Sequence, residues 1–400
     1  TYDMAVAAGM TGSPESRYID LYINHRYHGM YQLCEKVEID PERVPIADLE
    51  AENKKLNRDM ESCGHFETER RKGMVLPNEP RDTTGGYLLE RDVAEKFRLE
   101  ISGFYTETLK DLYTVKQPAY ASEAQVDYIS GLVNGMERAV AAVDGVDPQN
   151  GMQYTDYIDL RSFAQKYIIE ELCKNNGAGA TSSFFYKPQD AVSKKLFAGP
   201  VWDYDKAYAN LDGINESTGD LCYLMQRGTD PTTLFWHLYQ HSSFQETVSA
   251  CYEEFFSDYM QTMQEEKIDE YVSEIHAAKD MDLIRWKEIY GEPVDYEGEV
   301  QRIRDFLSAR KPFLDKVWKE RQEICTVSFV SEDGAIHNYM SVLKGERLER
   351  MPGAEPGTVS GDRVFDGWYT EEGIRIDETT PVSEDVTIYA RSSEVTGTAD

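Results

Sequence analysis

The stretch GGYLLERD, residues 85–92, predicts a buried strand that follows a glycine turn. Downstream of it, YTVKQP also has strand character and is stopped by Pro118. Upstream, YIDLYINHRYHGMYQLCEKVEID, residues 18–40, alternates apolar and polar residues on both sides of a short turn at His28 and Gly29. That alternation is typical of a β-hairpin. Together these segments predict one antiparallel sheet in the N-terminal part of the chain.

Two further segments lie around these strands. Residues 51–82 are polar and charged, with ENKKLNRDMESCGHFETERRKG in the middle, and we expect an exposed insertion or a long loop there. SSFFYK, residues 182–187, and KLFAGPVWDYD, residues 195–205, are short apolar runs separated by a polar turn. They predict a second hairpin.

Helical periodicity begins after the first set of strands. Residues 122–143 and 160–173 carry apolar side chains at helical spacing, and Asp159 suits the N-cap of the second helix. Each of these helices can bury one face. Residues 231–320 are again helical in pattern, and Pro312 predicts a kink or a boundary there.

Length and charge limit the kinds of protein this can be. At 400 residues the chain exceeds what one hydrophobic core usually fills, so we expect one large domain and one smaller unit. A net charge of -31 repels phosphate backbones and anionic lipid headgroups, which argues against nucleic acid and membrane surfaces as partners. A nucleotide would need a local basic pocket or a metal ion. No apolar run approaches the roughly 20 residues that span a bilayer.

The six cysteines are widely spread and form no CxxC pair, so their spacing excludes zinc-finger and thioredoxin-type sites. An even number of cysteines leaves disulfides open. Cys173 lies in an apolar helical run, where a buried free thiol is the commoner outcome. The cysteines therefore do not identify the compartment.

From Cys325 onward the pattern changes to short alternating strands with glycine and proline turns. We place a domain boundary at 323, which gives units at 1–323 and 324–400. FDGWY, followed by TPVSEDVTIYA, resembles the Listeria–Bacteroides repeat of bacterial surface proteins. The residues expected to form the small core of this module, with the last one closing it, are Val364, Phe365, Trp368, Tyr369 and Tyr389.

Most of the chain, residues 18–320, resembles the CotH (spore-coat protein H) kinase family in the order and spacing of its motifs. The matching pieces are YINHRYHGMYQLCEKV, GGYLLERD, SGFYTETLKDLYTVKQP, DLRSFAQKYIIEELCKN, FFYK and GPVWDYDKAY. The resemblance implies an α+β, atypical protein-kinase-like fold with an N-terminal antiparallel sheet and a helical C-terminal part, followed by the small β-rich module. It also implies ATP and Mg²⁺ or Mn²⁺ as cofactors. We expect a secreted or cell-surface bacterial protein whose export signal lies outside this chain.

A phosphotransferase site must neutralise a triphosphate and hold the attacking hydroxyl in line. The resemblance implies that Asp203 and Asp205 of WDYD bind the metal, with Asp203 also at the catalytic centre; the alternative is a turn or a helix cap. Lys116 could contact the phosphates and pair with Glu35 or Glu90, as lysine and glutamate do in kinases. A solvated strand lysine and two surface glutamates are the alternative.

The expected catalytic loop departs from the family. In CKNNGAGATSSFFYK, Gly177 stands where the family has a catalytic aspartate, and Ser182 occupies the later polar position. Glycine cannot accept a proton, so Asn176 remains as the candidate, with Asn175 beside it. An Asn-Gly helix stop with Gly177 at its C′ position is the alternative. Two hypotheses follow: an atypical kinase that phosphorylates Ser or Thr of an envelope or extracellular protein, or a catalytically degenerate pseudokinase that serves as a surface or binding module.

Overall fold

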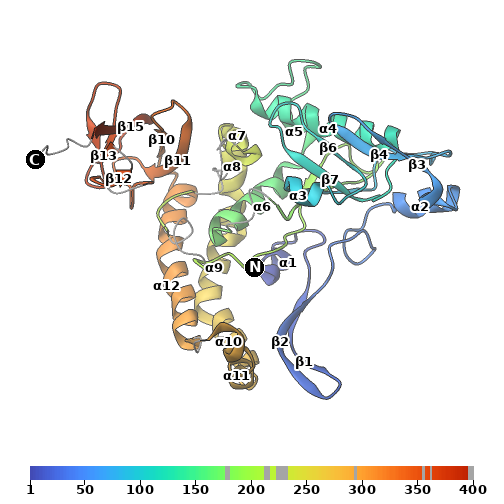
Figure 1. Cartoon of the computed structure of the whole chain (residues 1–400), viewed down its shortest axis with the longest axis horizontal. Coiled ribbons are helices and arrows are strands. Elements are labelled where there is room, and N and C mark those ends of the chain that lie inside the picture. Colours follow the sequence, from blue (N-terminus) through green and yellow to red (C-terminus); the bar gives the residue numbers. More distant parts are fainter. Residues whose placement is uncertain are drawn as a thin grey trace, which may run out of the picture.

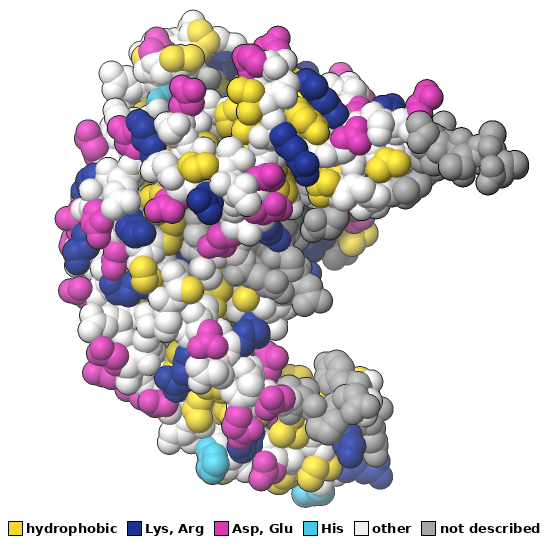
Figure 2. All heavy atoms as spheres, turned by 90° about the vertical axis from the view of Figure 1, so that its left-hand side faces the viewer, with side chains coloured by type: hydrophobic (Ala, Val, Ile, Leu, Met, Phe, Trp, Pro, Cys, Tyr) yellow, Lys and Arg dark blue, Asp and Glu magenta, His cyan; other side chains and the backbone are white. Residues whose placement is uncertain are grey.

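The fold is α+β, as the sequence predicts: antiparallel sheets and helices form a large body, and a separate six-stranded sheet lies at the C-terminal end (Figure 1). The structure is a computed structural model. It describes residues 1–175, 181–210, 217–221, 233–291, 295–353, 356–360 and 363–394. Acidic and basic side chains are interspersed over the face in Figure 2, so the net charge of -31 is spread out there rather than gathered in one field.

The main sheet has seven strands, and all its pairings are antiparallel. In spatial order its strands are β3 (Gly64–Glu67), β4 (Arg71–Val75), β6 (Gly103–Tyr105), β7 (Leu112–Gln117), β5 (Tyr87–Arg91), β8 (Ser183–Lys187) and β9 (Phe197–Ala198). The buried strand β5 lies between β7 and β8, which confirms the predicted strand. The pairing of β8 with β9 confirms the predicted second hairpin.

Strand β5 shows how the two faces of this sheet are covered. Its residues Tyr87 and Leu89 belong to the main core, whereas Leu88 belongs to a second cluster that includes Ile39 and Phe184. This alternation follows from the two-residue period of a strand. The sheet is therefore buried on both faces at β5.

Two capped helices, α4 (Glu123–Ala141) and α6 (Leu160–Cys173), supply much of the main core. Ser122 and Gln125 form a capping box, with the Ser122 hydroxyl accepting from the Gln125 amide at 3.2 Å. The Asp159 carboxylate accepts from the Ser162 amide at 2.8 Å, which confirms the predicted N-cap. Both predicted helices are thus confirmed, and Lys174 ends α6 in the left-handed conformation.

The remaining described helices of the body fill the N-terminal region and the region after residue 232. They are α1 (Tyr2–Ala7), α2 (Leu49–Leu56), η1 (Met60–Ser62), α3 (Ala94–Phe97), α5 (Tyr154–Tyr157), α7 (Leu234–Tyr239), α8 (Ser242–Cys251), η2 (Tyr252–Phe256), α9 (Ser257–Thr262), η3 (Met263–Lys267), α10 (Ile268–Ile275), α11 (Lys279–Tyr290), α12 (Tyr296–Leu314) and η4 (Asp315–Lys319). Pro312 lies in the last turn of α12, where the backbone passes into the π-helical η4, so the predicted boundary is confirmed. Within the described ranges, no helix has the length and apolarity needed to cross a membrane.

Three predictions for the N-terminal part are wrong. The hairpin predicted at residues 18–40 forms a two-stranded sheet of its own and does not join the main sheet. The first hairpin exists as β1 (Ser16–Ile23) and β2 (Arg26–Cys34), but its turn is Asn24–His25 rather than His28–Gly29. Asn24 and His25 have φ of 50° and 62°, which a two-residue hairpin turn requires and asparagine tolerates. Residues 51–82 are not a loop, because they contain most of α2 and the edge hairpin β3–β4. Edge strands with an exposed face carry polar residues, so the sequence of β3 and β4 resembles that of a polar loop.

The C-terminal module has its own sheet and core. Its strands are β10 (Ile324–Val330), β11 (Ile336–Leu343), β12 (Val359–Ser360), β13 (Arg363–Tyr369), β14 (Arg375–Ile376) and β15 (Val386–Glu394). Trp368 is buried in that core as predicted, and Phe365 packs against it, whereas Val364 and Tyr369 are only half-buried and lie outside it. Tyr389 does not close the core, because alternation along β15 buries its neighbour Ile388 and leaves Tyr389 37% exposed. The five cysteines in the described ranges are free, and Cys173 is buried as expected.

Candidate functional site

The structure brings together Lys116 of β7 and Glu90 of β5, two residues predicted to pair. Their Nζ and Oε2 atoms are 3.3 Å apart, and the side chain of Glu90 is only 9% exposed. Glu100, in the loop before β6, adds a second carboxylate, because its Oε1 lies 2.6 Å from the same Nζ. The Lys116 ammonium thus bridges a carboxylate of β5 and a carboxylate of the loop before β6.

Burial sets the protonation of this group of charges. Burial, and then the negative charge of Asp92, raises the pKa of Glu90, and Lys116 opposes that rise. Burial alone would lower the pKa of Lys116, but its hydrogen bond to Glu100 and the charge of Glu90 outweigh burial and raise it. Lys116 therefore keeps its charge at neutral pH, as a phosphate-binding cation must.

A second cluster of hydrogen-bonded side chains connects the end of β5 with the segment between α6 and β8. The Thr181 hydroxyl donates to Asp92 Oδ1 at 3.2 Å and lies 3.0 Å from the Lys96 ammonium, which donates to it. Asp92 is buried, and its other oxygen accepts from the Thr114 hydroxyl at 3.4 Å. Asp92 thereby connects β5 and β7 to residue 181, next to the start of β8.

Asp203 is held from several sides in a conformation that few non-glycine residues adopt. Its φ is 68°, in the left-handed region. Its Oδ2 accepts from the Ser182 hydroxyl at 3.0 Å, and its carbonyl accepts from the Asn175 side-chain amide at 3.1 Å. A positive φ at an aspartate persists only where the surroundings impose it, and such residues cluster at functional sites.

Asp203 and Asp205 both line a cavity of about 710 Å³ between α1, the ends of β1 and β2, and α10. They do not lie at a strand end, because β9 stops at Ala198 and the chain continues without regular structure. Both side chains are exposed. The predicted aspartate pair is therefore accessible to a ligand in that cavity.

The residues present fit Mg²⁺ but do not form a complete protein cage. Among the described residues, no cluster of three or more His, Cys, Asp and Glu side chains could hold a metal ion. Mg²⁺ is usually bound through one or two carboxylates, with the other positions taken by water and substrate phosphates. Two exposed aspartates on one cavity match that donor set, and Asp203 and Asp205 would be the protein ligands.

Other predicted residues lie apart from this arrangement. The Glu35 carboxylate accepts from the Glu15 amide at 3.0 Å across the β1–β2 hairpin, whereas the ion partners of Lys116 are Glu90 and Glu100. Asn176 and Gly177 lie outside the described residues. The catalytic role of Asn176 stays a prediction. The helix stop predicted at Gly177 is wrong, because α6 ends at Cys173 with Lys174 as its C-cap.

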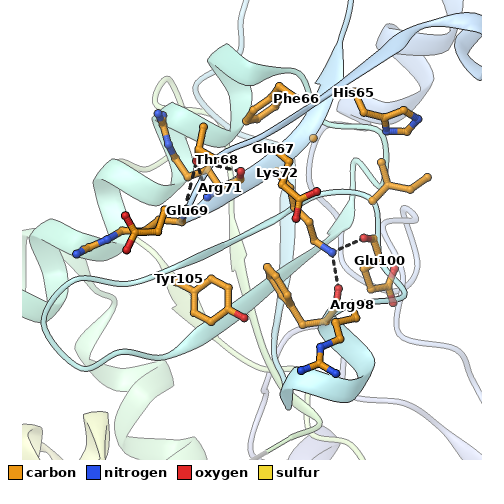
Figure 3. A pocket seen from close by; sticks show the side chains of 14 residues that line it. His65, Phe66, Glu67, Thr68, Glu69, Arg71, Lys72, Arg98, Glu100 and Tyr105 are labelled. Atoms are coloured by element: carbon orange, nitrogen blue, oxygen red, sulfur yellow. Dashed lines mark hydrogen bonds between the residues drawn. The ribbon is translucent and has the colours of Figure 1, made fainter.

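A cavity of about 680 Å³ adjoins Lys116 through the shared residue Glu100 (Figure 3). It lies beside β3, β4 and α3, and its cationic side chains are Arg70, Arg71, Lys72 and Arg98. The Lys72 ammonium donates to the Glu100 carbonyl at 2.6 Å and sits 4.2 Å from the centre of the Phe97 ring. Glu67, Glu69 and Glu100 also line the cavity, and Arg70 and Arg71 pair with Glu107 and Asp127, so its charge is mixed.

Sequence reasoning missed Glu100, Asp92 and Lys96. Glu100 lies in a loop and carries no pattern of its own. Asp92 follows Glu90 by two residues, so the period of the strand could have indicated that both point the same way. The position of Lys96 depends on how α3 packs against the sheet, which one sequence does not specify.

A seven-stranded antiparallel sheet with a lysine–glutamate pair, next to a helical part, defines a kinase-like α+β protein. The family of CotH kinase proteins matches residues 1–314, so the chain belongs to the CotH kinase family. The comparison with curated proteins finds no match.

Proposed function

We propose that residues 1–323 act as an atypical protein kinase that binds ATP with Mg²⁺ or Mn²⁺ and transfers the γ-phosphate to Ser or Thr of a protein. The observation that carries the proposal is the pairing of Lys116 with the buried Glu90, in a chain of the CotH kinase family. Kinases use such a pair to hold the phosphates of the nucleotide. We further propose that the protein is secreted or displayed on the cell surface, with residues 324–400 as a repeat-type module.

The proposed roles follow from charge and access. Lys116, with the cationic side chains of the cavity beside it, would neutralise the phosphates. Asp203 and Asp205 would bind the metal, which lowers the charge on the transferred group. Ser182 would orient Asp203 through the hydroxyl that it already donates.

Calorimetric titration of ATP into the full chain, with and without Mg²⁺ or Mn²⁺, tests the nucleotide site. We expect metal-dependent binding that Asp203→Asn abolishes, because a neutral amide is a poor Mg²⁺ ligand. Asp258→Asn is the matched control, since Asp258 is an exposed aspartate on α9, remote in sequence from the WDYD motif. Equal metal-dependent binding in wild type and Asp203→Asn would reject the assignment of Asp203.

A second candidate is a pseudokinase that binds nucleotide without transferring phosphate. It is favoured by the sequence NGAGA at 176–180, which contains no carboxylate, and by Asn175, whose amide is already bonded to the Asp203 carbonyl. Loss of a general base typically costs about 10²–10⁴ in rate. Incubation with γ-labelled ATP separates the two functions: label on the chain or on a Ser/Thr acceptor supports a kinase, and nucleotide binding without label supports the pseudokinase.

A further inference from the structure

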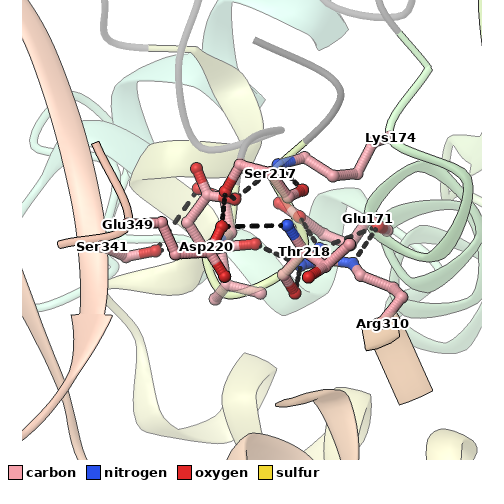
Figure 4. Close-up of polar contacts among 9 residues, drawn as sticks. Glu171, Lys174, Ser217, Thr218, Asp220, Arg310, Ser341 and Glu349 are labelled. Carbon is pink, nitrogen blue, oxygen red and sulfur yellow. Dashed lines mark hydrogen bonds and ion pairs between the residues drawn. The ribbon is translucent and has the colours of Figure 1, made fainter. Parts of the chain in front are cut away.

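A buried polar network lies at the end of α6, next to the residues that hold Asp203 (Figure 4). The side chain of Lys174 is fully buried. Its ammonium donates to the Ser217 carbonyl at 2.5 Å and pairs with the Asp220 carboxylate. A lysine buried this deeply stays in place only while its partners do.

Helix α12 fixes the segment that carries those partners. The guanidinium of Arg310, also fully buried, donates to the Thr218 carbonyl at 2.9 Å and to the Asp220 carbonyl. It also pairs with the Glu171 carboxylate at 3.0 Å and donates to the Glu171 carbonyl. Residues 217–221 are thereby held between α6 and α12.

The C-terminal module holds the same segment from its other side. The Leu221 amide donates to the Ser341 hydroxyl at 2.7 Å, and that hydroxyl lies 3.4 Å from the Leu221 carbonyl. Ser341 is 4% exposed. Glu349 Oε2 lies 2.7 Å from the Ser217 hydroxyl and 3.2 Å from the Thr218 amide. Glu349 thus contacts Ser217, whose carbonyl accepts from Lys174. The module is therefore bonded to the segment and is not merely tethered to it.

Two bonds connect this network with the aspartate motif. Asn175, which directly follows Lys174, donates its side-chain amide to the Asp203 carbonyl. The Tyr208 amide, just after the motif, donates to the Cys173 carbonyl at 2.8 Å. The backbone around Asp203 is thus supported by residues 173–175, the residues that Lys174 anchors.

We propose that Ser341 and Glu349 of the C-terminal module are positioning residues for the metal-binding aspartate. They hold residues 217–221, these residues hold Lys174, and Lys174 keeps Asn175 and Asp203 in place. This inference rests on the proposed function, because it takes Asp203 as a metal ligand. It gives the module a part in the site beyond that of a spacer.

Four single variants of the full chain test the proposal. Ser341→Ala removes the hydroxyl, and Ser341→Thr keeps it and should restore wild-type behaviour. Glu349→Gln removes a charge at the less buried contact, so it should fold even if Ser341→Ala does not. Glu346→Gln removes the same charge from an exposed residue of the same loop and is the control.

The first measurement is the Mg²⁺ affinity at saturating ATP. We expect Ser341→Ala to weaken it ~10-fold, the scale seen when an outer partner of a ligand is lost, with a smaller loss for Glu349→Gln. ATP affinity without metal should stay unchanged, since Lys116 lies outside the network. Wild-type Mg²⁺ affinity in both Ser341→Ala and Glu349→Gln would overturn the proposal.

The second measurement is hydrogen exchange, which needs no activity. The proposal requires faster exchange of the Asn175 and Tyr208 amides in Ser341→Ala and Glu349→Gln, and wild-type exchange in Glu346→Gln. A purely structural contact would speed exchange in 217–221 and in the module alone, and that result would overturn the proposal. If wild type binds no metal-nucleotide, the proposed function fails, and exchange at the Asn175 and Tyr208 amides alone decides whether the module supports this segment.

Discussion

Glu137 is a carboxyl group buried on α4 behind the main sheet, and its side chain allows a sharp test of the structure. It is fully buried, and one of its oxygens accepts from the Leu109 amide at 3.0 Å. Burial, and then the charge of the nearby Asp111, raises the pKa of Glu137 to about 8. The native protein therefore keeps this carboxyl protonated at neutral pH.

The sign and size of the effect on stability follow from linkage. Between the ordinary glutamate pKa of 4.5 and about 8, the unfolded state has lost this proton and the native state has not, so raising the pH destabilises the fold. At ~1.36 kcal/mol per pKa unit, the full window amounts to at most about 5 kcal/mol. Glutamine has no proton to lose. Glu137→Gln should therefore match wild type to within ~1 kcal/mol near pH 4.5, and exceed it by at least ~2 kcal/mol at pH 8.

Urea unfolding of wild type and Glu137→Gln at a series of pH values measures this difference directly. Glu123→Gln is the matched control, because Glu123 is an exposed glutamate at the start of the same helix. Its difference from wild type should not depend on pH over this window. A constant difference between Glu137→Gln and wild type from pH 5 to pH 8 would refute the reasoning.

Two further predictions concern buried contacts. Arg310→Met should lower the free energy of unfolding by ~3–5 kcal/mol, because it leaves a buried carboxylate without its partner. Arg304→Met, on the partly exposed side of the same helix, should lower the free energy of unfolding by no more than ~1 kcal/mol. If urea unfolding shows equal losses for Arg310→Met and Arg304→Met, the buried contacts of Arg310 do not stabilise the fold as described. Gly85→Ala should fail to fold by circular dichroism, because its Cβ would lie 2.2 Å from the Gln189 backbone nitrogen. Gly131→Ala, in open space on α4, should be neutral or stabilising. A Gly85→Ala protein that folds and is as stable as wild type would contradict the close approach of Gly85 to the Gln189 backbone.

The parts of the fold that sequence predicted are those with strong local signals. An apolar run after a glycine turn identified β5, helical spacing identified α4 and α6, and the N-cap Asp159 identified the start of α6, because these signals arise within a few residues. The edge hairpin of β3 and β4 was missed, since strands with one exposed face read as a polar loop. The turn at Asn24–His25 was placed too late because a glycine nearby was the stronger turn residue in the sequence.

The candidate site was predictable only where the family pattern and strand period agreed. Lys116 and Glu90 fall on strands that pair with each other, so their contact could be anticipated, whereas Glu35 belongs to a separate hairpin. Lys174 and Arg310 could not be singled out, because charged residues are normally solvated and their burial depends on distant segments. Single-sequence reasoning thus gave the paired strands but not the buried charges behind them.

The pairing of β10 with β15 has a consequence for the order in which the protein can assemble during synthesis. These strands run in parallel and are the first and last of the module, so its sheet cannot close before residue 394 leaves the ribosome. At about 5–20 residues per second, Arg310 precedes that moment by roughly 4–17 seconds. For that interval residues 217–221 of the newly made kinase-like part lack the contacts that Ser341 and Glu349 of the completed module make with them. A nascent chain of this protein therefore passes through a period in which residues 217–221 are made but the module that bonds to them is not yet complete.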